Sequence, residues 1–378
     1  MKMDWPTHPL ANYVTSRPGN NKIIKGSQSS QPRDGLVQAF SASGPDVWVA
    51  SADYSRPGVV ISAVGARCGK TFIATGEWTA IANTHVLLPG DQIDPRWLWY
   101  RTNDESFWIR GGTAQPFVKV KETLLQPCKI PPLPEQRRIV ALLDEAFKAL
   151  ATAKANAEQN LQNARALFES HLESVFTEKG IDWVGTTIGK EINFIDYRGK
   201  TPVKTTRGVR LITAKNVKMG FLQDAPNEFI AADSYESWMT RGIPKKGDVL
   251  FTTEAPLANV AQLDTDDRVA FAQRIIIMQP NPARLDSAFL KYLLLSKPVQ
   301  QRIRERGTGA TVQGIKASLL KLIDISFPVS LAIQEEMVDK LDSLSHEVQR
   351  LASIYERKLA ALEELKTSLL HQAFNGEL

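Results

Sequence analysis

Two long stretches of the chain place apolar or small side chains at alternating intervals of three and four residues. The later stretch covers about residues 334–374 and has one interruption, at Lys358. The earlier stretch, about 135–176, repeats the pattern with smaller side chains, and neither contains an internal Gly or Pro. This spacing is typical of a coiled-coil seam. The predicted seam consists of Ile139, Leu143, Ala146, Leu150, Ala153, Ala157, Ala164 and Leu167 in the first stretch and Met337, Leu341, Leu344, Val348, Leu351, Tyr355, Leu362, Leu365 and Leu369 in the second.

Two matching seams in one chain can cover each other. At 1.5 Å per residue, about 40 helical residues form a rod of roughly 60 Å, longer than one compact domain needs. Pro134 and Pro328 mark the helix starts, because proline is tolerated there and not inside a helix. We therefore expect an antiparallel intramolecular pair that acts as a spacer. The alternative is that each helix packs only on its own globular domain.

The chain also contains an internal repeat. Residues 111–176 align with 309–374 without a gap at an offset of 198, which places Gln136 on Gln334 and Asp144 on Asp342. The two halves open alike as well, since Trp5 matches Trp183 at an offset of 178. Between these anchors the halves diverge. A repeated frame carrying two different inserts predicts two related domains with pseudo-twofold symmetry.

The inserts alternate short β-rich runs with turn signals. Residues 58–62, 85–88, 249–252 and 274–278 are strand-like, and short helices are expected near 95–102 and 288–306. We predict an α+β protein in which two mixed α/β target-recognition domains are separated by two long antiparallel coiled-coil helices. The predicted boundaries are 1–133 for the first domain, 134–176 for the first helix, 177–330 for the second domain and 331–378 for the second helix.

Charge divides along the same boundaries. The 378 residues carry a net charge of +5, with +4 and +6 on the two predicted domains and −1 and −4 on the two helices. Basic domains favour a polyanionic ligand, whereas acidic helices suit protein partners. Neither a signal sequence nor a membrane span is apparent, so a cytoplasmic protein is expected. Cys68 and Cys128 have no metal-ligand or redox spacing, and we expect both in the core.

This arrangement resembles the specificity subunits of type I restriction-modification systems over nearly the whole chain. Residues 130–140 (IPPLPEQRRIV) and 327–336 (FPVSLAIQEE) resemble the family's proline-rich helix entries, and 362–370 (LEELKTSLL) resembles its helix ending. In the second domain, 199–202 (GKTP), 208–212 (GVRLI) and 247–250 (GDVL) are similar to recurrent recognition-domain stretches. The order and duplication of these stretches carry the resemblance, and the first domain departs further from it.

The resemblance implies a DNA-recognition function without catalysis by this chain. Each domain would read one half of an asymmetric, bipartite double-stranded DNA target, and the helices would fix the spacing between the halves. Two modification (methyltransferase) subunits would grip the helices, and restriction and translocase subunits would join them. S-adenosylmethionine, Mg²⁺ and ATP would be bound by those partners, leaving this chain with no cofactor or metal of its own. The helix positions expected to bind partners are Leu143, Leu150, Leu167, Leu341, Leu351, Leu362 and Leu365.

Motifs for chemistry are missing from the sequence. The segment 65–71 (GARCGKT) resembles a phosphate-binding loop, but one residue too few separates its glycines. The chain has no Asn-Pro-Pro-aromatic tetrapeptide of an amino-methyltransferase, and its five histidines have no paired metal spacing. Methylation is therefore expected to come from a partner.

DNA contacts require cationic, amide or hydroxyl side chains on exposed loops. In the second domain the candidates are Arg198, Lys200, Thr201, Lys204, Thr205, Arg207, Lys215, Asn216, Gln273 and Arg274. In the first domain they are Lys22, Lys25, Gln28, Arg33, Arg67, Lys70 and Asn83. For each, a solvated surface loop is the competing explanation.

Two other functions stay open at this point. A coiled-coil assembly protein with protein-binding globular ends would bind DNA weakly and without strong dependence on salt, whereas phosphate contacts give steep salt dependence. A fragment of a fused restriction enzyme is disfavoured, because the repeat leaves no segment for a catalytic domain.

Overall fold

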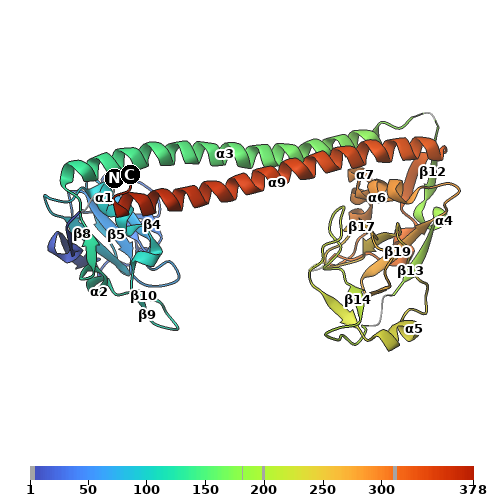
Figure 1. Cartoon of the computed structure of the whole chain (residues 1–378), viewed down its shortest axis with the longest axis horizontal. Coiled ribbons are helices and arrows are strands. Elements are labelled where there is room, and N and C mark those ends of the chain that lie inside the picture. The colour runs from blue at the N-terminus through green and yellow to red at the C-terminus, as the bar shows by residue number, and fades with distance from the viewer. Residues whose placement is uncertain (1–4, 181, 198–200, 310–312) are drawn as a thin grey trace. The chain divides into compact units, whose positions relative to one another are not determined.

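The computed structural model describes residues 5–180, 182–197, 201–309 and 313–378 (Figure 1). The chain divides into two compact units. Unit 1 comprises Met1–Glu158 and Glu356–Leu378, and unit 2 comprises Gln159–Tyr355. The division cuts both long helices near their middles. Each unit therefore consists of one globular domain together with half of each helix.

The two long helices, α3 (Leu133–Thr177) and α9 (Leu331–Asn375), confirm the sequence prediction. Pro134 occupies the first turn of α3, where a missing N–H costs nothing. Helix α9 ends at Asn375; the next residue, Gly376, adopts a φ of +78°, and Glu377 N donates to Gln372 O at 3.0 Å. These contacts form a Schellman cap, in which glycine takes the left-handed conformation that other residues avoid.

Within each unit the two helix halves pack against each other. In unit 1, Lys154 Nζ lies 2.6 Å from Glu363 Oε1, and Arg138 Nη2 donates to Leu378 O at 2.8 Å. Residue numbers therefore rise along α3 as they fall along α9, which confirms the antiparallel pairing. In unit 2, Leu172 and Leu341 belong to one hydrophobic cluster.

Most predicted seam positions are buried or half-buried, with two exceptions. The side chains of Leu167 and Leu365 are 56% and 48% exposed. Their assignment to the seam was wrong. In unit 2 the neighbouring Phe168, rather than Leu167, packs against the hydrophobic core. Leu167 is therefore exposed although its spacing fits the seam.

Unit 1 contains two main sheets beside the helices. Strands β2, β8, β5 and β6 form an antiparallel sheet in that order, and β4, β3 and β7 form a second sheet in which β3 and β7 are parallel. A short pair, β1 with β11, joins the start of the domain to its end. The elements of this domain are β1 (Thr7–Pro9), η1 (Leu10–Asn12), β2 (Val14–Pro18), η2 (Lys25–Ser27), β3 (Val37–Ser41), β4 (Gly44–Val49), β5 (Gly58–Ser62), β6 (Thr71–Ala74), β7 (Trp78–Ala80), β8 (Thr84–Pro89), α1 (Pro95–Thr102), η3 (Glu105–Phe107), β9 (Arg110–Gly111), β10 (Phe117–Val118), α2 (Val120–Leu124) and β11 (Pro127–Lys129).

Unit 2 repeats this topology. Its four-stranded antiparallel sheet has the order β13, β19, β16 and β17, its three-stranded sheet has the order β15, β14 and β18 with β14 parallel to β18, and β12 pairs with β20. The elements are β12 (Trp183–Thr187), α4 (Ile188–Glu191), β13 (Ile192–Asp196), β14 (Val209–Ile212), β15 (Glu228–Ile230), η4 (Ala232–Ser234), α5 (Tyr235–Trp238), β16 (Val249–Thr252), β17 (Val260–Gln262), β18 (Val269–Phe271), β19 (Ile275–Pro280), α6 (Ser287–Leu295), α7 (Lys297–Glu305), α8 (Ala317–Lys321) and β20 (Asp324–Pro328).

All four predicted strands are present, as β5, β8, β16 and β19. They pair two by two, β5 with β8 in unit 1 and β16 with β19 in unit 2. The predicted helix at 95–102 matches α1, whereas the one at 288–306 is divided at Ser296 into α6 and α7. Both cysteines are buried and unpaired, as expected for core residues. No helix in the described ranges has the length and apolar character required to cross a membrane.

The repeated glutamines tie each long helix to its domain. Gln136 is fully buried, accepts a hydrogen bond from Asp94 N at 2.8 Å, and donates to Gln92 O and Pro131 O at 2.9 and 2.8 Å. Its repeat partner in unit 2 makes the same contacts. Gln334 accepts from Asp286 N at 2.8 Å and donates to Arg284 O and Pro328 O at 2.9 and 2.7 Å. The amide thus gives hydrogen-bond partners to buried and part-buried main-chain groups where the domain meets the helix.

The repeated aspartates make a second junction. Tyr100 Oη donates to Asp144 Oδ1 at 2.6 Å, and Arg96 Nη2 lies 2.6 Å from the same oxygen. In unit 2, Tyr292 donates to Asp342, whose carboxylate also pairs with Lys291 at 3.3 Å. Burial and the adjacent carboxylate raise the pKa of Tyr100 to about 12, and they raise the pKa of Tyr292 as well. Both phenols are therefore held as neutral donors.

Candidate nucleic-acid interface

The basic loop predicted in the second domain is partly engaged in its own structure. Lys204 Nζ lies 2.7 Å from Glu228 Oε2, and Thr205 Oγ1 donates to Arg207 O at 2.8 Å. Thr201 and Arg207 are exposed, whereas Arg198 and Lys200 lie outside the described residues. The loop therefore presents Thr201 and Arg207 to solvent, with the Lys204 ammonium already balanced by a carboxylate.

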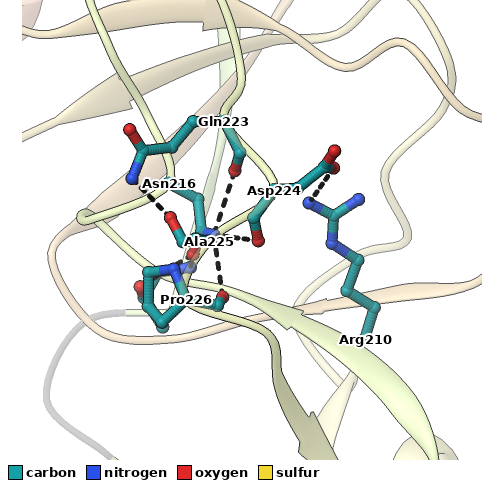
Figure 2. A network of polar contacts seen from close by, with 7 residues as sticks. Arg210, Asn216, Gln223, Asp224, Ala225 and Pro226 are labelled. Atoms are coloured by element: carbon teal, nitrogen blue, oxygen red, sulfur yellow. Dashed lines mark hydrogen bonds and ion pairs between the residues drawn. The ribbon is translucent and has the colours of Figure 1, made fainter. Parts of the chain in front are cut away.

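Asn216 has a structural role (Figure 2). Its side chain is 1% exposed, its Oδ1 accepts from Thr213 N and Oγ1 at 3.0 and 2.9 Å, and its Nδ2 donates to the carbonyls of Gln223, Asp224 and Pro226 at 3.2, 3.3 and 3.0 Å. These bonds use both ends of the amide, so the prediction that Asn216 contacts DNA is wrong. The residue fixes a loop instead.

The loop that Asn216 fixes runs from β14 to β15. Arg210 Nη2 lies 3.0 Å from Asp224 Oδ1 at its base, as Figure 2 shows, and Gly220 N donates to Val260 O at 2.7 Å. Lys215 is exposed on this loop, next to the buried asparagine. A cation on a rigid loop loses little conformational freedom when it binds an anion, which keeps Lys215 a candidate phosphate contact.

Arg274 lies at the start of the central strand β19. It is exposed, its φ is +79°, and its Nε lies 3.0 Å from Glu254 Oε1. Its carbonyl accepts from Thr253 N at 2.9 Å, which joins it to the loop after β16. Gln273 beside it is half-buried. An arginine held by a carboxylate on one side presents its remaining donors in a defined direction.

In unit 1, Asn83 lies at the start of the strand β8. It is exposed, its φ is +65°, and its carbonyl accepts from Ala63 N at 2.9 Å, in the loop after β5. That loop also carries the exposed cations Arg67 and Lys70, and the Lys70 ammonium lies 5.8 Å from the centre of the Phe72 ring. The hydrogen bond from Ala63 thus places Asn83 beside the start of the loop that carries Arg67 and Lys70.

The other candidates in unit 1 lie on the segment between β2 and β3. Lys22 and Arg33 are exposed, and Gln28 is half-buried with its Nε2 3.3 Å from Ser27 Oγ. Lys25 Nζ lies 2.5 Å from Asp46 Oδ2. Burial alone would raise the pKa of Asp46, but hydrogen bonds from Lys25 and Ser41 outweigh it and lower that pKa. Asp46 is therefore ionised at neutral pH and engages Lys25, and Lys22 and Arg33 are the other cations of this segment that an external anion could meet.

The predicted partner-binding leucines fall into three groups. Leu143 and Leu341 are 1% and 0% exposed within the cores of units 1 and 2, so assigning them to partner binding was wrong. They anchor the helices to the domains. Leu150, Leu351 and Leu362 are half-buried along the helix pair, whereas Leu167 and Leu365 are exposed and open to a partner.

Sequence reasoning missed Glu254 as the partner of Arg274. The two residues are 20 positions apart, and only the pairing of β16 with β19 brings them together. The available signal was the strand prediction itself, because two adjacent antiparallel strands place the end of one beside the start of the other. No cluster of three or more His, Cys, Asp or Glu side chains suited to a metal ion occurs among the residues that the structure describes.

The fold and the repeated frame define a two-domain protein with paired long helices, and comparison with known proteins gives its family. The model of the type I restriction modification DNA specificity domain matches residues 49–162 and 180–356. These matches cover more than half of the chain and include part of each domain. The chain belongs to this family and is a type I restriction-modification specificity subunit.

Individual relatives agree over most of the chain. The type I restriction enzyme MjaVIII specificity subunit of Methanocaldococcus jannaschii is 22% identical over 83% of this chain and 77% of its own length. The putative type I restriction enzyme specificity subunit S.HindORF215P of Haemophilus influenzae is 21% identical over 92% of this chain and 89% of its own length.

Solved structures share the fold. A chain from work on complex assembly and conformational transition of the type I R-M system matches with a TM-score of 0.76 and 18% identity, over 99% of this chain and 98% of that one. The HsdS subunit of Thermoanaerobacter tengcongensis matches with a TM-score of 0.59 and 17% identity, over 99% and 97% of the two chains.

Proposed function

We propose that this specificity subunit reads a bipartite, asymmetric DNA target, one half with each globular domain. The observation that carries the proposal is that two domains of one topology present different side chains on equivalent loops. Unit 1 offers Arg67, Lys70 and Asn83 there, and unit 2 offers Arg274 paired with Glu254. Equivalent frames with different surface residues suit two different half-sites.

The paired helices would set the spacing of the half-sites and receive the partner subunits. An α-helix keeps a fixed rise per residue, so α3 and α9 suit a spacer. The exposed leucines at 167 and 365 lie outside the helix seam and offer apolar surface for partner helices. Two methyltransferase subunits and the restriction subunits are the proposed partners, and they would bind S-adenosylmethionine, Mg²⁺ and ATP. The subunit itself would carry out no catalysis.

The first test is to co-express the chain with the methyltransferase encoded beside it and to map methylated adenines in the host genome by single-molecule sequencing. We expect a split motif with an unread spacer. A purified complex should bind that motif with an affinity that falls steeply with salt, because phosphate contacts release counterions. Failure to form a complex, together with weak and salt-insensitive DNA binding, would favour a coiled-coil assembly protein instead.

Partner binding has its own matched pair of variants. Leu365→Asp places a charge on an exposed helix position, so the subunit should fold normally but lose the methyltransferase during size-exclusion chromatography. Leu362→Asp places the charge in the half-buried seam and should also lower the thermal midpoint. Normal assembly by the folded Leu365→Asp variant would contradict the proposed partner surface.

A further inference from the structure

Asn83 and Arg274 occupy the same structural position in the two units. Each follows the strand that pairs in parallel with the middle of the three-stranded sheet, and each directly precedes a central strand of the four-stranded sheet, β8 or β19. The carbonyl of each accepts from the first residue after the neighbouring strand, Ala63 N or Thr253 N, at 2.9 Å in both cases. The gapless part of the sequence repeat does not include either residue, so the correspondence comes from the structure.

The next layer of contacts repeats as well. Ala63 O accepts from Val118 N at 2.9 Å in unit 1, and Thr253 O accepts from Ile315 N at 2.9 Å in unit 2. The residue that follows Ala63 is Val64, and the residue that follows Thr253 is Glu254; these form bridges with Phe117 and Gly314, respectively. The two loops are therefore built alike around the two positions.

Both positions have left-handed backbones, with φ of +65° at Asn83 and +79° at Arg274. Glycine enters this region at no steric cost, asparagine tolerates it, and a long side chain such as arginine is strained there. Fold stability alone would favour glycine over arginine at position 274. Non-glycine residues held in a strained conformation occur preferentially at functional sites, which points to a use for the Arg274 side chain beyond the fold.

The two side chains are those that read bases in the major groove. Asparagine pairs with N6 and N7 of adenine, and arginine pairs with O6 and N7 of guanine. Glu254 engages Arg274 at Nε, and the terminal nitrogens Nη1 and Nη2 form the fork that fits a guanine edge. In unit 1 the corresponding residue is the uncharged Val64. This agrees with the role of Asn83, because a neutral amide that reads a base requires no carboxylate to orient it.

We propose that Asn83 and Arg274 are equivalent base-reading residues of the two units. Asn83 reads an adenine in one half-site and Arg274 reads a guanine in the other, with Glu254 as a positioning residue. This inference rests on the proposed recognition of a bipartite DNA target. It assigns one base pair of each half-site to one side chain.

The test uses the full chain in complex with its methyltransferase and duplexes that carry the mapped target with each base pair substituted in turn. Arg274→Gly should abolish discrimination at one G·C pair in one half-site, a loss of about tenfold or more. Discrimination in the other half-site should be unchanged. Asn83→Gly should abolish discrimination at one A·T pair in the opposite half. Glu254→Gln should weaken discrimination at the same pair as Arg274→Gly and at no other.

Stability provides a second readout. Because glycine relieves the backbone strain and an exposed ion pair contributes little, Arg274→Gly should keep or raise the thermal midpoint while it loses discrimination. Arg274→Lys retains the charge but not the fork and should lose discrimination at the same base pair. Arg268→Ala removes another exposed arginine of unit 2 and Asn12→Ala another exposed asparagine of unit 1. Both controls should leave all base preferences unchanged.

The outcomes separate this inference from the function on which it rests. A wild-type complex with no split motif overturns both. If the wild-type complex reads a split motif and the Arg274→Gly and Asn83→Gly variants read the same motif unchanged, only the base-reading assignment is overturned. Equal loss of affinity for every sequence would make the two residues phosphate contacts and would likewise overturn it.

Discussion

The domains of units 1 and 2 share a sheet topology but differ in several connections, among them the loop between two strands of the three-stranded sheet. In unit 1, β3 and β4 are joined by Ala42 and Ser43 alone, whereas in unit 2 the equivalent strands β14 and β15 are joined by residues 213–227. The longer connection is held by Asn216 and carries the exposed Lys215. The comparison teaches that the frame is constant where it meets the helices and variable where it meets solvent.

The largest expected effect concerns the constant part. Gln136→Leu and Gln334→Leu each remove the side-chain partner of three main-chain groups, one in a buried contact and two in part-buried contacts. We expect each to destabilise its own unit by about 3 kcal/mol. Urea unfolding with hydrogen exchange read separately for each unit measures the effect. Gln159→Leu, at an exposed position of α3, is the control. If only one of the two variants destabilises its unit, the two junctions are not equivalent.

A smaller effect is expected in the variable part. Asn216→Ala removes five hydrogen bonds within the 213–226 segment, at a cost of about 2 kcal/mol because solvent can replace some of them. Hydrogen exchange should quicken in that segment and stay unchanged in unit 1. Asn193→Ala, which alters an exposed amide of the same unit, serves as the control. If Asn216→Ala instead alters base preference while hydrogen exchange in the segment stays unchanged, Asn216 contacts DNA after all.

Tyr100→Phe and Tyr292→Phe test the second junction, each with an expected cost of about 1 kcal/mol. The pKa of Tyr100 is raised in the folded state, so its contribution is fully present below the unfolded value of 10.0 and is lost as pH rises toward about 12. The pKa of Tyr292 is raised for the same reasons, burial first and then Asp342. Unfolding free energies measured across this range should depend less on pH in each variant. An unchanged pH dependence would contradict the assignment.

The smallest effect is expected at the ion pair between the helix halves of unit 1. A hydrogen bond from Lys154 lowers the pKa of Glu363 below its ordinary value of 4.5, so any contribution exists above that value and is lost as pH falls through the lower folded pKa. Both side chains are exposed to solvent, and we expect Glu363→Gln to leave the thermal midpoint nearly unchanged. A clear drop that disappears at high salt would show that the pair matters more than exposed pairs usually do.

Periodicity and repetition in the sequence predicted much of this protein. The alternating apolar spacing gave both long helices to within a few residues, because a helix without internal Gly or Pro shows its buried face directly in the sequence. The repeat identified Gln136 with Gln334 and Asp144 with Asp342 before their contacts were known. The four predicted strands were also correct, since buried strands of β-branched residues are recognisable locally.

The candidate interface was predicted less well. Exposed cations such as Arg67 and Arg207 were placed correctly on loops, but a polar residue type does not reveal whether its side chain faces water or the protein interior. Asn216 faces the interior, where main-chain carbonyls surround it. Leu167 is exposed although it fits the seam spacing, because Phe168 beside it fills the core.

The sequence alone determined the family, the two-domain organisation and the helix pairing, because these depend on patterns that extend over tens of residues. Only the tertiary structure decided that Asn83 and Arg274 are equivalent, that Glu254 orients Arg274, and that Gln136 and Gln334 bind main-chain groups of their domains. Each of these relations joins residues from different strands or loops. Their proximity depends on how the strands pair, and pairing brings distant segments together through main-chain hydrogen bonds. Every residue offers a carbonyl acceptor and every residue except proline an N–H donor, so the residue types do not show which segments pair.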